Sequence, residues 1–182
     1  MAGKDLVYWD SCAFLALLKN ETQHGEDELP ALRAIAYEFD TGVIFLASST
    51  VTLLEVLSAN LDDAVREKFE GVVQRSNFVK VEASEYVMRL AAKVRRYYHG
   101  KLVDGNGSNL IVSSADAIHI ASGLAIGCQT FITLDVRDKP NKREAGLLKL
   151  ASHGPILGSH KMQIQRPSFG SSGGLFALDG ER

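Results

Sequence analysis

The sequence predicts an α/β protein, a three-layer α/β/α sandwich with a central, mainly parallel sheet. Three short apolar runs have the length and composition of buried strands: "DLVYW" at 5–9, "VIFLASS" at 43–49 and "CQTFITLD" at 128–135. Segments with helical spacing of apolar residues lie between them, and strands that alternate with helices are typical of parallel sheets. With 182 residues, of which 46% are hydrophobic and 23% charged, the chain has the size and composition of one globular domain.

The first part of the chain contains the helices expected around the first two strands. Four segments have apolar residues at helical spacing: 11–21, 26–42, 50–60 and 61–76. In the second of them, Pro30 lies near the start and Gly42 lies just past the end, which is the placement that both residues prefer in helices. A weak alternation of apolar and polar residues at 77–83 predicts a short strand.

The second part of the chain continues this pattern. Three further helices are expected, at 84–100, 115–127 and 142–154. Ser84 is a favourable N-cap, Gly127 ends the middle helix, and the turn residues between 101 and 114 predict a loop. An edge strand is expected at 154–161.

We expect one domain over residues 1–155 and a C-terminal extension over residues 156–182. From about Met162 the chain is rich in Gly and Ser and has only isolated apolar residues. This composition indicates either a flexible end or an arm that folds on a partner.

Charge and cysteine content limit the classes of function. A net charge of -2 and a pI of about 6.2 exclude a protein that is basic throughout, so an RNA partner requires a local basic patch. Neither Cys12 nor Cys128 belongs to a CxxC pair or a His cluster, which argues against a zinc site, and two cysteines fit a reducing compartment. The sequence shows neither a signal peptide nor an apolar run long enough to cross a membrane, so we expect a cytoplasmic protein.

Four acidic residues lie at the ends of predicted elements. Asp10 and Asp135 end the first and third strands. Glu55 lies one turn into the helix after the second strand, and Asp116 lies in the first turn of the helix before the third. The carboxyl ends of parallel strands share one edge of a sheet, so these side chains can converge there. Carboxylates that lie together repel one another unless a hard cation such as Mg²⁺ binds them, and such clusters hydrolyse phosphodiesters.

Each acid also has a structural explanation. Asp116 suits the first turn of a helix, where anions are favoured, and Asp10 suits an N-cap. Glu55 lies among leucines and valines, where a lone carboxylate is costly to bury and needs a partner. His119 is spaced three residues after Asp116 and is expected in the core or at the rim of a site rather than as a ligand. Cys12 is expected as a small buried group rather than a nucleophile.

Three segments resemble the PIN domain, the metal-dependent ribonuclease fold of VapC-type toxins: "VYWDSCAFLALL", "SSTVTLLEVL" and "SSADAIHIASGLAIGCQTFITLDVRD". The resemblance covers roughly residues 5–150. The first acid of that family follows the first strand, as Asp10 does, although a cysteine stands two residues later at a usually polar position. The second is a glutamate in the helix after the second strand, as Glu55 is. The third and fourth match Asp116 in "DAIHIA" and Asp135 in "TLDVRD".

The resemblance implies a PIN-like fold and a Mg²⁺- or Mn²⁺-dependent endoribonuclease that cleaves single-stranded RNA. It implies a catalytic metal site formed by Asp10, Glu55, Asp116 and Asp135, with Glu55 binding directly or through water. Ser11 and Thr133 would hold the carboxylates or a water molecule at the metal, and Asp138 would replace Asp135 or support the site. The family habit further implies a toxin of a toxin–antitoxin pair, a homodimer, and an antitoxin whose segment occupies the acidic groove.

Two basic clusters are candidates for RNA binding. Arg95 and Arg96 lie beside tyrosines in "KVRRYYHGK", and Arg137 and Lys139 directly follow the last acid in "VRDKPNKREAG". Basic groups bind the RNA backbone and aromatic rings stack on bases, so both clusters suit single-stranded RNA. A basic helix end that complements the helix dipole and a solvated loop are the structural alternatives.

Other functions stay open on the sequence alone. The alternatives within the family are a non-toxin PIN nuclease of RNA processing and a non-catalytic RNA- or protein-binding module. The presence of all four acids argues against the non-catalytic alternative. A phosphatase of the haloacid dehalogenase type also uses an Asp after its first strand. It requires a second Asp two residues later, where this chain has Cys12.

Overall fold

A computed structural model describes residues 4–169. The main sheet of the described chain has five strands, β1 (Leu6–Trp9), β2 (Phe45–Ser49), β3 (Phe78–Val81), β6 (Thr130–Ile132) and β7 (Gln163–Gln165). Its α-helices are α1 (Ser11–Leu18), α2 (Glu28–Asp40), α3 (Thr50–Leu57), α4 (Asp63–Val73), α5 (Glu85–Tyr98), α6 (Ser114–Ala125) and α7 (Leu147–Ala151). A hairpin of β4 (Leu102–Val103) and β5 (Asn109–Leu110) and a 3-10 helix (Pro140–Lys142) complete these elements. Within residues 4–169, no helix combines the length and apolarity required to cross a membrane.

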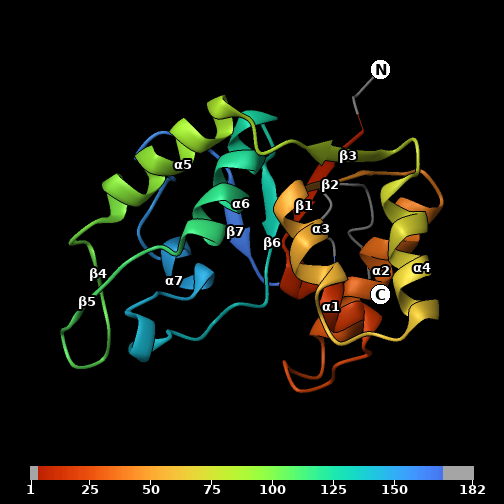
Figure 1. Ribbon diagram of the computed structural model, residues 1–182, viewed down its shortest axis with the longest axis horizontal. Coiled ribbons are helices and arrows are strands. Elements are labelled where there is room, and N and C mark those ends of the chain that lie inside the picture. The colour runs from red at the N-terminus through yellow and green to blue at the C-terminus, as the bar shows by residue number, and fades with distance from the viewer. Residues whose placement is uncertain (1–3, 170–182) are drawn as a thin grey trace, which may run out of the picture.

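Helices cover both faces of the main sheet (Figure 1). The helices α1 to α4 lie on one face, and α5, α6 and α7 lie on the other. Successive residues of β1 point to opposite faces, because Val7 and Trp9 pack with the first group of helices and Tyr8 packs with the second. The sheet therefore has a hydrophobic core on each side, and the predicted three-layer α/β/α fold is confirmed.

The order of the strands reverses beside β1. The strand order is β3-β2-β1-β6-β7, and every neighbouring pair is parallel. From β1 the chain builds β2 and β3 on one side, and later adds β6 and β7 on the other. Ligands bind at the carboxyl ends of such strands where the order reverses. Asp10 follows β1 and Thr133 follows β6, so the reversal lies where the predicted acids leave the sheet.

The C-terminal part of the described chain differs from the prediction. The edge strand expected at 154–161 is a turn closed by a bridge between Ile156 and His160, and β7 is the edge strand instead. In β7 a buried isoleucine stands between two glutamines, which is the alternation of a strand with one covered face. Residues 163–165 thus belong to the sheet, although the prediction assigned 156–182 to an extension. The part of the expected arm at 170–182 lies outside the described residues.

Candidate active site

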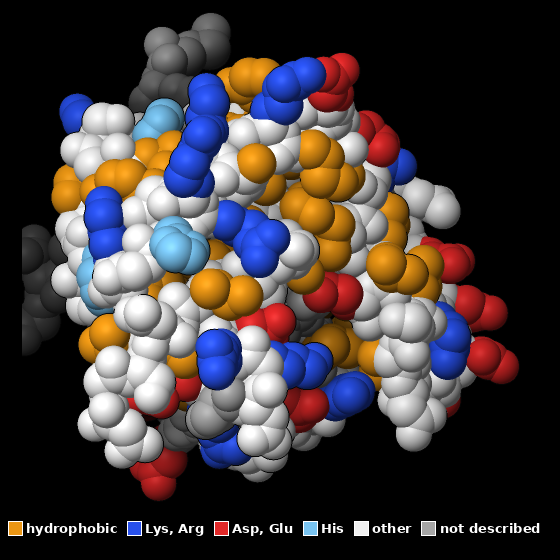
Figure 2. Space-filling view, turned by 60° about the vertical axis from the view of Figure 1, so that its left-hand side comes forward, with side chains coloured by type: hydrophobic (Ala, Val, Ile, Leu, Met, Phe, Trp, Pro, Cys, Tyr) orange, Lys and Arg blue, Asp and Glu red, His pale blue; other side chains and the backbone are white. Residues whose placement is uncertain are grey.

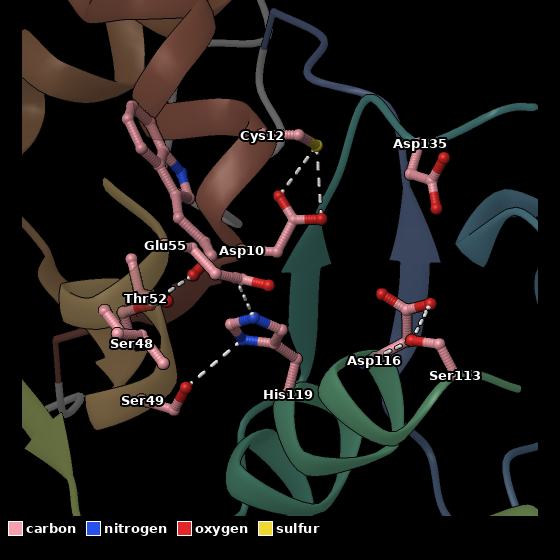
Figure 3. Close-up of polar contacts among 12 residues, drawn as sticks. Asp10, Cys12, Ser48, Ser49, Thr52, Glu55, Ser113, Asp116, His119 and Asp135 are labelled. Atoms are coloured by element: carbon pink, nitrogen blue, oxygen red, sulfur yellow. Dashed lines mark hydrogen bonds and ion pairs between the residues drawn. The ribbon is translucent and has the colours of Figure 1, made fainter. Parts of the chain in front are cut away.

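A cavity of about 410 Å³ lies at the carboxyl ends of β1 and β6. Four predicted acids line it: Asp10, Glu55, Asp116 and Asp135. Figure 3 places Asp116 and Asp135 on one side of the site and Asp10 and Glu55 on the other. The fold therefore brings together four carboxylates that are far apart in the sequence.

Asp10 is the acid with the least contact with solvent, with 3% of its surface exposed. It is the N-cap of α1, where its Oδ1 accepts a hydrogen bond from the backbone N–H of Ala13 at 3.2 Å. Thr133 Oγ1 donates to its Oδ2 at 2.6 Å. Burial raises the pKa of Asp10, and the charge of His119 and these hydrogen bonds offset only part of that effect. The charged carboxylate is therefore costly here unless a cation lies in the cavity.

Cys12 provides a thiol donor beside Asp10. Its Sγ donates to Asp10 Oδ1 at 2.9 Å and accepts from the backbone N–H of Leu134 at 3.0 Å (Figure 3). Burial, reinforced by the charge of Asp10, raises the pKa of Cys12 well above its usual range, so the thiol keeps its proton at neutral pH. Cys12 was predicted to be a small buried group, but it is half-buried and lines the cavity.

Glu55 has the partner that its apolar surroundings require. His119 Nε2 donates to Glu55 Oε2 at 3.0 Å, and the His119 side chain is 2% exposed. Burial raises the pKa of Glu55, but the hydrogen bond and charge of His119, aided by Ser11 and Lys139, outweigh burial and lower it. Glu55 is accordingly held as a carboxylate at neutral pH.

His119 connects Glu55 to the core. Its Nδ1 lies 3.0 Å from the hydroxyl of Tyr8 and 3.2 Å from that of Ser49. Burial raises the pKa of Tyr8, so the phenol keeps its proton. A charged His119 and a neutral ring that accepts from Tyr8 at Nδ1 both carry a proton on Nε2, which faces Glu55. The sequence indicated a core or rim position for His119 but not its hydrogen bond to Glu55. Its spacing of three residues from Asp116, on a similar helical face, was the only sequence feature that pointed toward the site.

Asp116 is held by the residue that starts its helix. Ser113 is the N-cap of α6, accepts from the backbone N–H of Asp116 at 3.1 Å, and donates to Asp116 Oδ2 at 2.6 Å (Figure 3). Burial raises the pKa of Asp116, Ser113 lowers it, and the charge of Asp135 raises it further. Asp116 therefore belongs to the first turn of α6 and also lines the acidic cavity.

Asp135 lies in the loop after β6 and is held by backbone groups. Its N–H donates to Thr133 Oγ1 at 3.0 Å, and its Oδ2 accepts from the N–H of Leu147 at 3.3 Å. Lys139 Nζ lies 3.8 Å from the same Oδ2. Burial raises the pKa of Asp135, and Lys139 offsets part of this rise.

The predicted supporting residues occupy different positions. Ser11 lines the cavity, and Thr133 contacts two of the four acids. Asp138 does not line the cavity within the described chain, because its carboxylate accepts from Gly146 N–H at 3.2 Å and pairs with Lys149 Nζ. In this structure Asp138 therefore fixes the start of α7, and its role as a replacement for the fourth acid stays a prediction.

The predicted RNA-binding residues form two groups. Arg137 and Lys139 line the cavity, and Figure 2 shows basic side chains around acidic ones in a hollow of the surface. Arg95 and Arg96 are exposed on α5 and do not line the cavity. Arg95 Nε donates to the carbonyl of Val112 at 3.0 Å, so it supports the segment before α6.

The cavity also contains residues to which no sequence pattern pointed. Gln23 and His24 come from the loop before α2, and Arg166 follows β7. No motif surrounds Arg166, and the strand that brings it to the site was expected several residues earlier in the chain. Only the fold could place it.

The donors around the cavity suit a hard divalent cation. They are carboxylate oxygens, which Mg²⁺ and Mn²⁺ accept as ligands. Among the residues that the structure describes, no three His, Cys, Asp or Glu side chains lie close enough together to hold one ion directly. Mg²⁺ is usually held by one or two carboxylates and keeps several waters, so this spacing fits an ion bound partly through water.

Comparison with known proteins shows to which family the chain belongs. The PIN domain model matches residues 7–139, and no curated protein matches the chain. The chain is similar to a solved structure of VapBC2 from Rickettsia felis bound to a promoter DNA fragment, at 14% identity and a TM-score of 0.47, covering 77% of this chain and 96% of that chain. It is also similar to a toxin–antitoxin complex from Klebsiella pneumoniae, at 15% identity and a TM-score of 0.43, covering 72% and 88%. The family match confirms the resemblance found in the sequence, and the chain belongs to the PIN domain family.

Proposed function

We propose that this protein is a metal-dependent endoribonuclease that hydrolyses phosphodiester bonds of single-stranded RNA. PIN domains are generally nucleases, which supports a nuclease-type hydrolase. The observation that carries the proposal is the convergence of four carboxylates in one cavity where the strand order reverses. Burial raises the pKa of three of them, so the cluster is costly to the fold unless a cation compensates.

The side chains of the site have separate tasks in this proposal. Mg²⁺ or Mn²⁺ in the cavity would supply an activated water and offset the charge that develops on the phosphate. Asp10, Asp116 and Asp135 would hold the ion, and Glu55 would do so directly or through water. Thr133 and His119 orient these acids, as their hydrogen bonds indicate. Arg137 and Lys139 attract the phosphate, with Arg95 and Arg96 extending the basic surface.

We further propose that the chain is the toxin of a toxin–antitoxin pair, acts in the cytoplasm and forms a homodimer. The support is the resemblance of three sequence segments to VapC-type toxins. An antitoxin segment in the open acidic cavity would keep RNA away. Expression of the chain alone in a bacterium should then arrest growth, whereas expression of Asp116→Asn should not. Equal growth of both cultures, with equal protein levels, would overturn the toxin proposal.

Cleavage of labelled single-stranded RNA tests the nuclease proposal. The wild-type chain should cleave with Mg²⁺ or Mn²⁺ and not with EDTA. Asp10→Asn and Asp116→Asn should lose about 100-fold or more of the rate, because loss of one electrostatic contact to the transition state has this effect in other enzymes. Asp63→Asn is the matched control, because this exposed acid also lies in the first turn of a helix but does not line the cavity. Equal rates for all four proteins would overturn the assignment of the site.

A further inference from the structure

The cavity contains a guanidinium group from outside the family match. Arg166 directly follows β7, whereas the match ends at residue 139. The backbone N–H of Thr133 donates to the carbonyl of Gln165 at 3.0 Å, so the end of β7 lies beside the residue that holds Asp10. Because β7 is parallel to β6, Arg166 leaves the sheet at the same edge as the acids, and it lines the same cavity.

The position of this guanidinium is fixed by groups at the start of α2 and in the loop before it. Arg166 Nη1 forms an ion pair with Glu28 Oε1 and donates to the carbonyl of His24 at 3.5 Å. The Glu28 side chain is 13% exposed and lies at the start of α2, which makes it a firm anchor. An ion pair with an exposed arginine contributes little to stability, so its main effect is to orient the guanidinium.

Arg166 combines an anchored position with donors that are free for a ligand, which distinguishes it from Lys139. Within residues 4–169, its guanidinium forms hydrogen bonds only through Nη1, which leaves the N–H groups of Nε and Nη2 for a ligand. Lys139 already lies 3.8 Å from Asp135. A planar guanidinium with two free donor positions matches two oxygens of one phosphate, which a lysine ammonium does not.

On this geometry we propose that Arg166 binds a backbone phosphate of single-stranded RNA in the cavity, a contact that rests on the proposed nuclease function. Four carboxylates repel a phosphate, and the ion offsets only part of their charge. A fixed guanidinium in the lining of the same cavity supplies the remaining attraction and sets the distance of the phosphate from the acids. Glu28 is then a positioning residue that acts through Arg166.

The test measures RNA affinity apart from cleavage. Fluorescence anisotropy with a labelled single-stranded RNA of random sequence is recorded in the Asp116→Asn background, across a series of salt concentrations. Arg166→Gln should weaken binding about tenfold or more, as loss of a charged hydrogen bond does. It should also reduce the slope of log K against log salt by about 0.7, the value for one phosphate contact to a single strand. Arg166→Lys should bind with intermediate affinity. When Arg166→Gln is made in the otherwise wild-type chain, its affinity for Mn²⁺ should equal that of the wild type, because Arg166 is not a proposed metal ligand.

Arg75→Gln is the matched control, because Arg75 also pairs with an acid, Asp40, and is exposed to a similar degree, but does not line the cavity. Arg166→Gln binding RNA with the affinity and salt slope of Arg75→Gln would overturn the inference while wild-type cleavage upholds the nuclease. Wild-type affinity in Arg166→Lys, which keeps the charge and the fold, would overturn the two-oxygen contact. A wild-type chain that neither binds nor cleaves single-stranded RNA would overturn both proposals.

Discussion

Single hydroxyl and imidazole groups hold the acids of this site in fixed positions. Thr133 Oγ1 donates to the carboxylate of Asp10 and accepts from the N–H of Asp135, so one side chain fixes two acids from adjacent strands. One ring nitrogen of His119 holds Glu55, and the other contacts the hydroxyl of Tyr8 in the core. Acids held in this way keep their geometry while their charges repel, which a site assembled from freely rotating side chains cannot do.

His119 provides a prediction at the scale of one residue. Replacing it by alanine leaves the buried hydroxyl of Tyr8 without this partner and releases Glu55. We expect His119→Ala to lower the free energy of unfolding by about 1–3 kcal/mol and RNA cleavage by about tenfold. Ile120→Val is the control, because Ile120 is fully buried on the same helix and has an apolar side chain that forms no hydrogen bond with Glu55. Loss of stability in both variants with equal cleavage rates would show that His119 does not position Glu55.

The buried acids predict how stability depends on pH in EDTA. Burial raises the pKa of Asp10, Asp116 and Asp135 above their values in the unfolded chain. Between those two values the folded protein binds more protons than the unfolded one. The free energy of unfolding should therefore decrease as the pH is raised from the unfolded-state pKa of these groups through their folded-state pKa, and should increase when the pH is lowered across the same window.

Urea unfolding of the metal-free protein at several pH values measures this effect. Asp116→Asn should be more stable than wild type at neutral pH and should respond less to pH, because one costly charge is removed. Asp63→Asn should behave as the wild type does, since Asp63 is exposed. A wild-type protein with maximal stability at neutral pH and a steady loss on acidification would contradict the prediction.

The start of α6 serves both the helix and the site. Ser113 caps the helix and holds Asp116, so Ser113→Ala should lower the free energy of unfolding by about 1 kcal/mol and also lower cleavage. Ser84 caps α5 through the N–H of Val87 and lies outside the cavity lining. Ser84→Ala should therefore cost similar stability and leave cleavage unchanged. Thermal unfolding and RNA cleavage of both variants check this, and equal cleavage would contradict the double role of Ser113.

Elements with strong local signals could be predicted from the sequence. Ser84 before α5 and Gly127 after α6 lie at the helix ends that cap chemistry requires, and the apolar runs of β1, β2 and β6 are strands. The edge strand was predicted at residues 154–161, several residues before β7. In β7 only Ile164 marks the covered face, and three residues are too few to show the alternation of a strand. Arg166 was missed with it, since its place depends on that strand.

At the scale of the whole molecule, the topology makes the site. Asp10 and Asp135 follow the two strands on either side of the reversal in strand order. The resemblance to the PIN domain identified all four acids that line the cavity. It did not reveal the partners of these acids, because contacts such as that of His119 with Tyr8 depend on side chains from distant segments.

The central claim is that these four carboxylates form one site for a divalent cation. Titration of Mn²⁺ into the purified protein by calorimetry tests it most directly, because it requires neither the RNA target nor a partner. Wild type and Asp63→Asn should bind Mn²⁺ with equal affinity, and Asp116→Asn should bind about tenfold or more weakly. Equal Mn²⁺ affinity in all three proteins, or no heat of binding in the wild type at millimolar Mn²⁺, would contradict the claim.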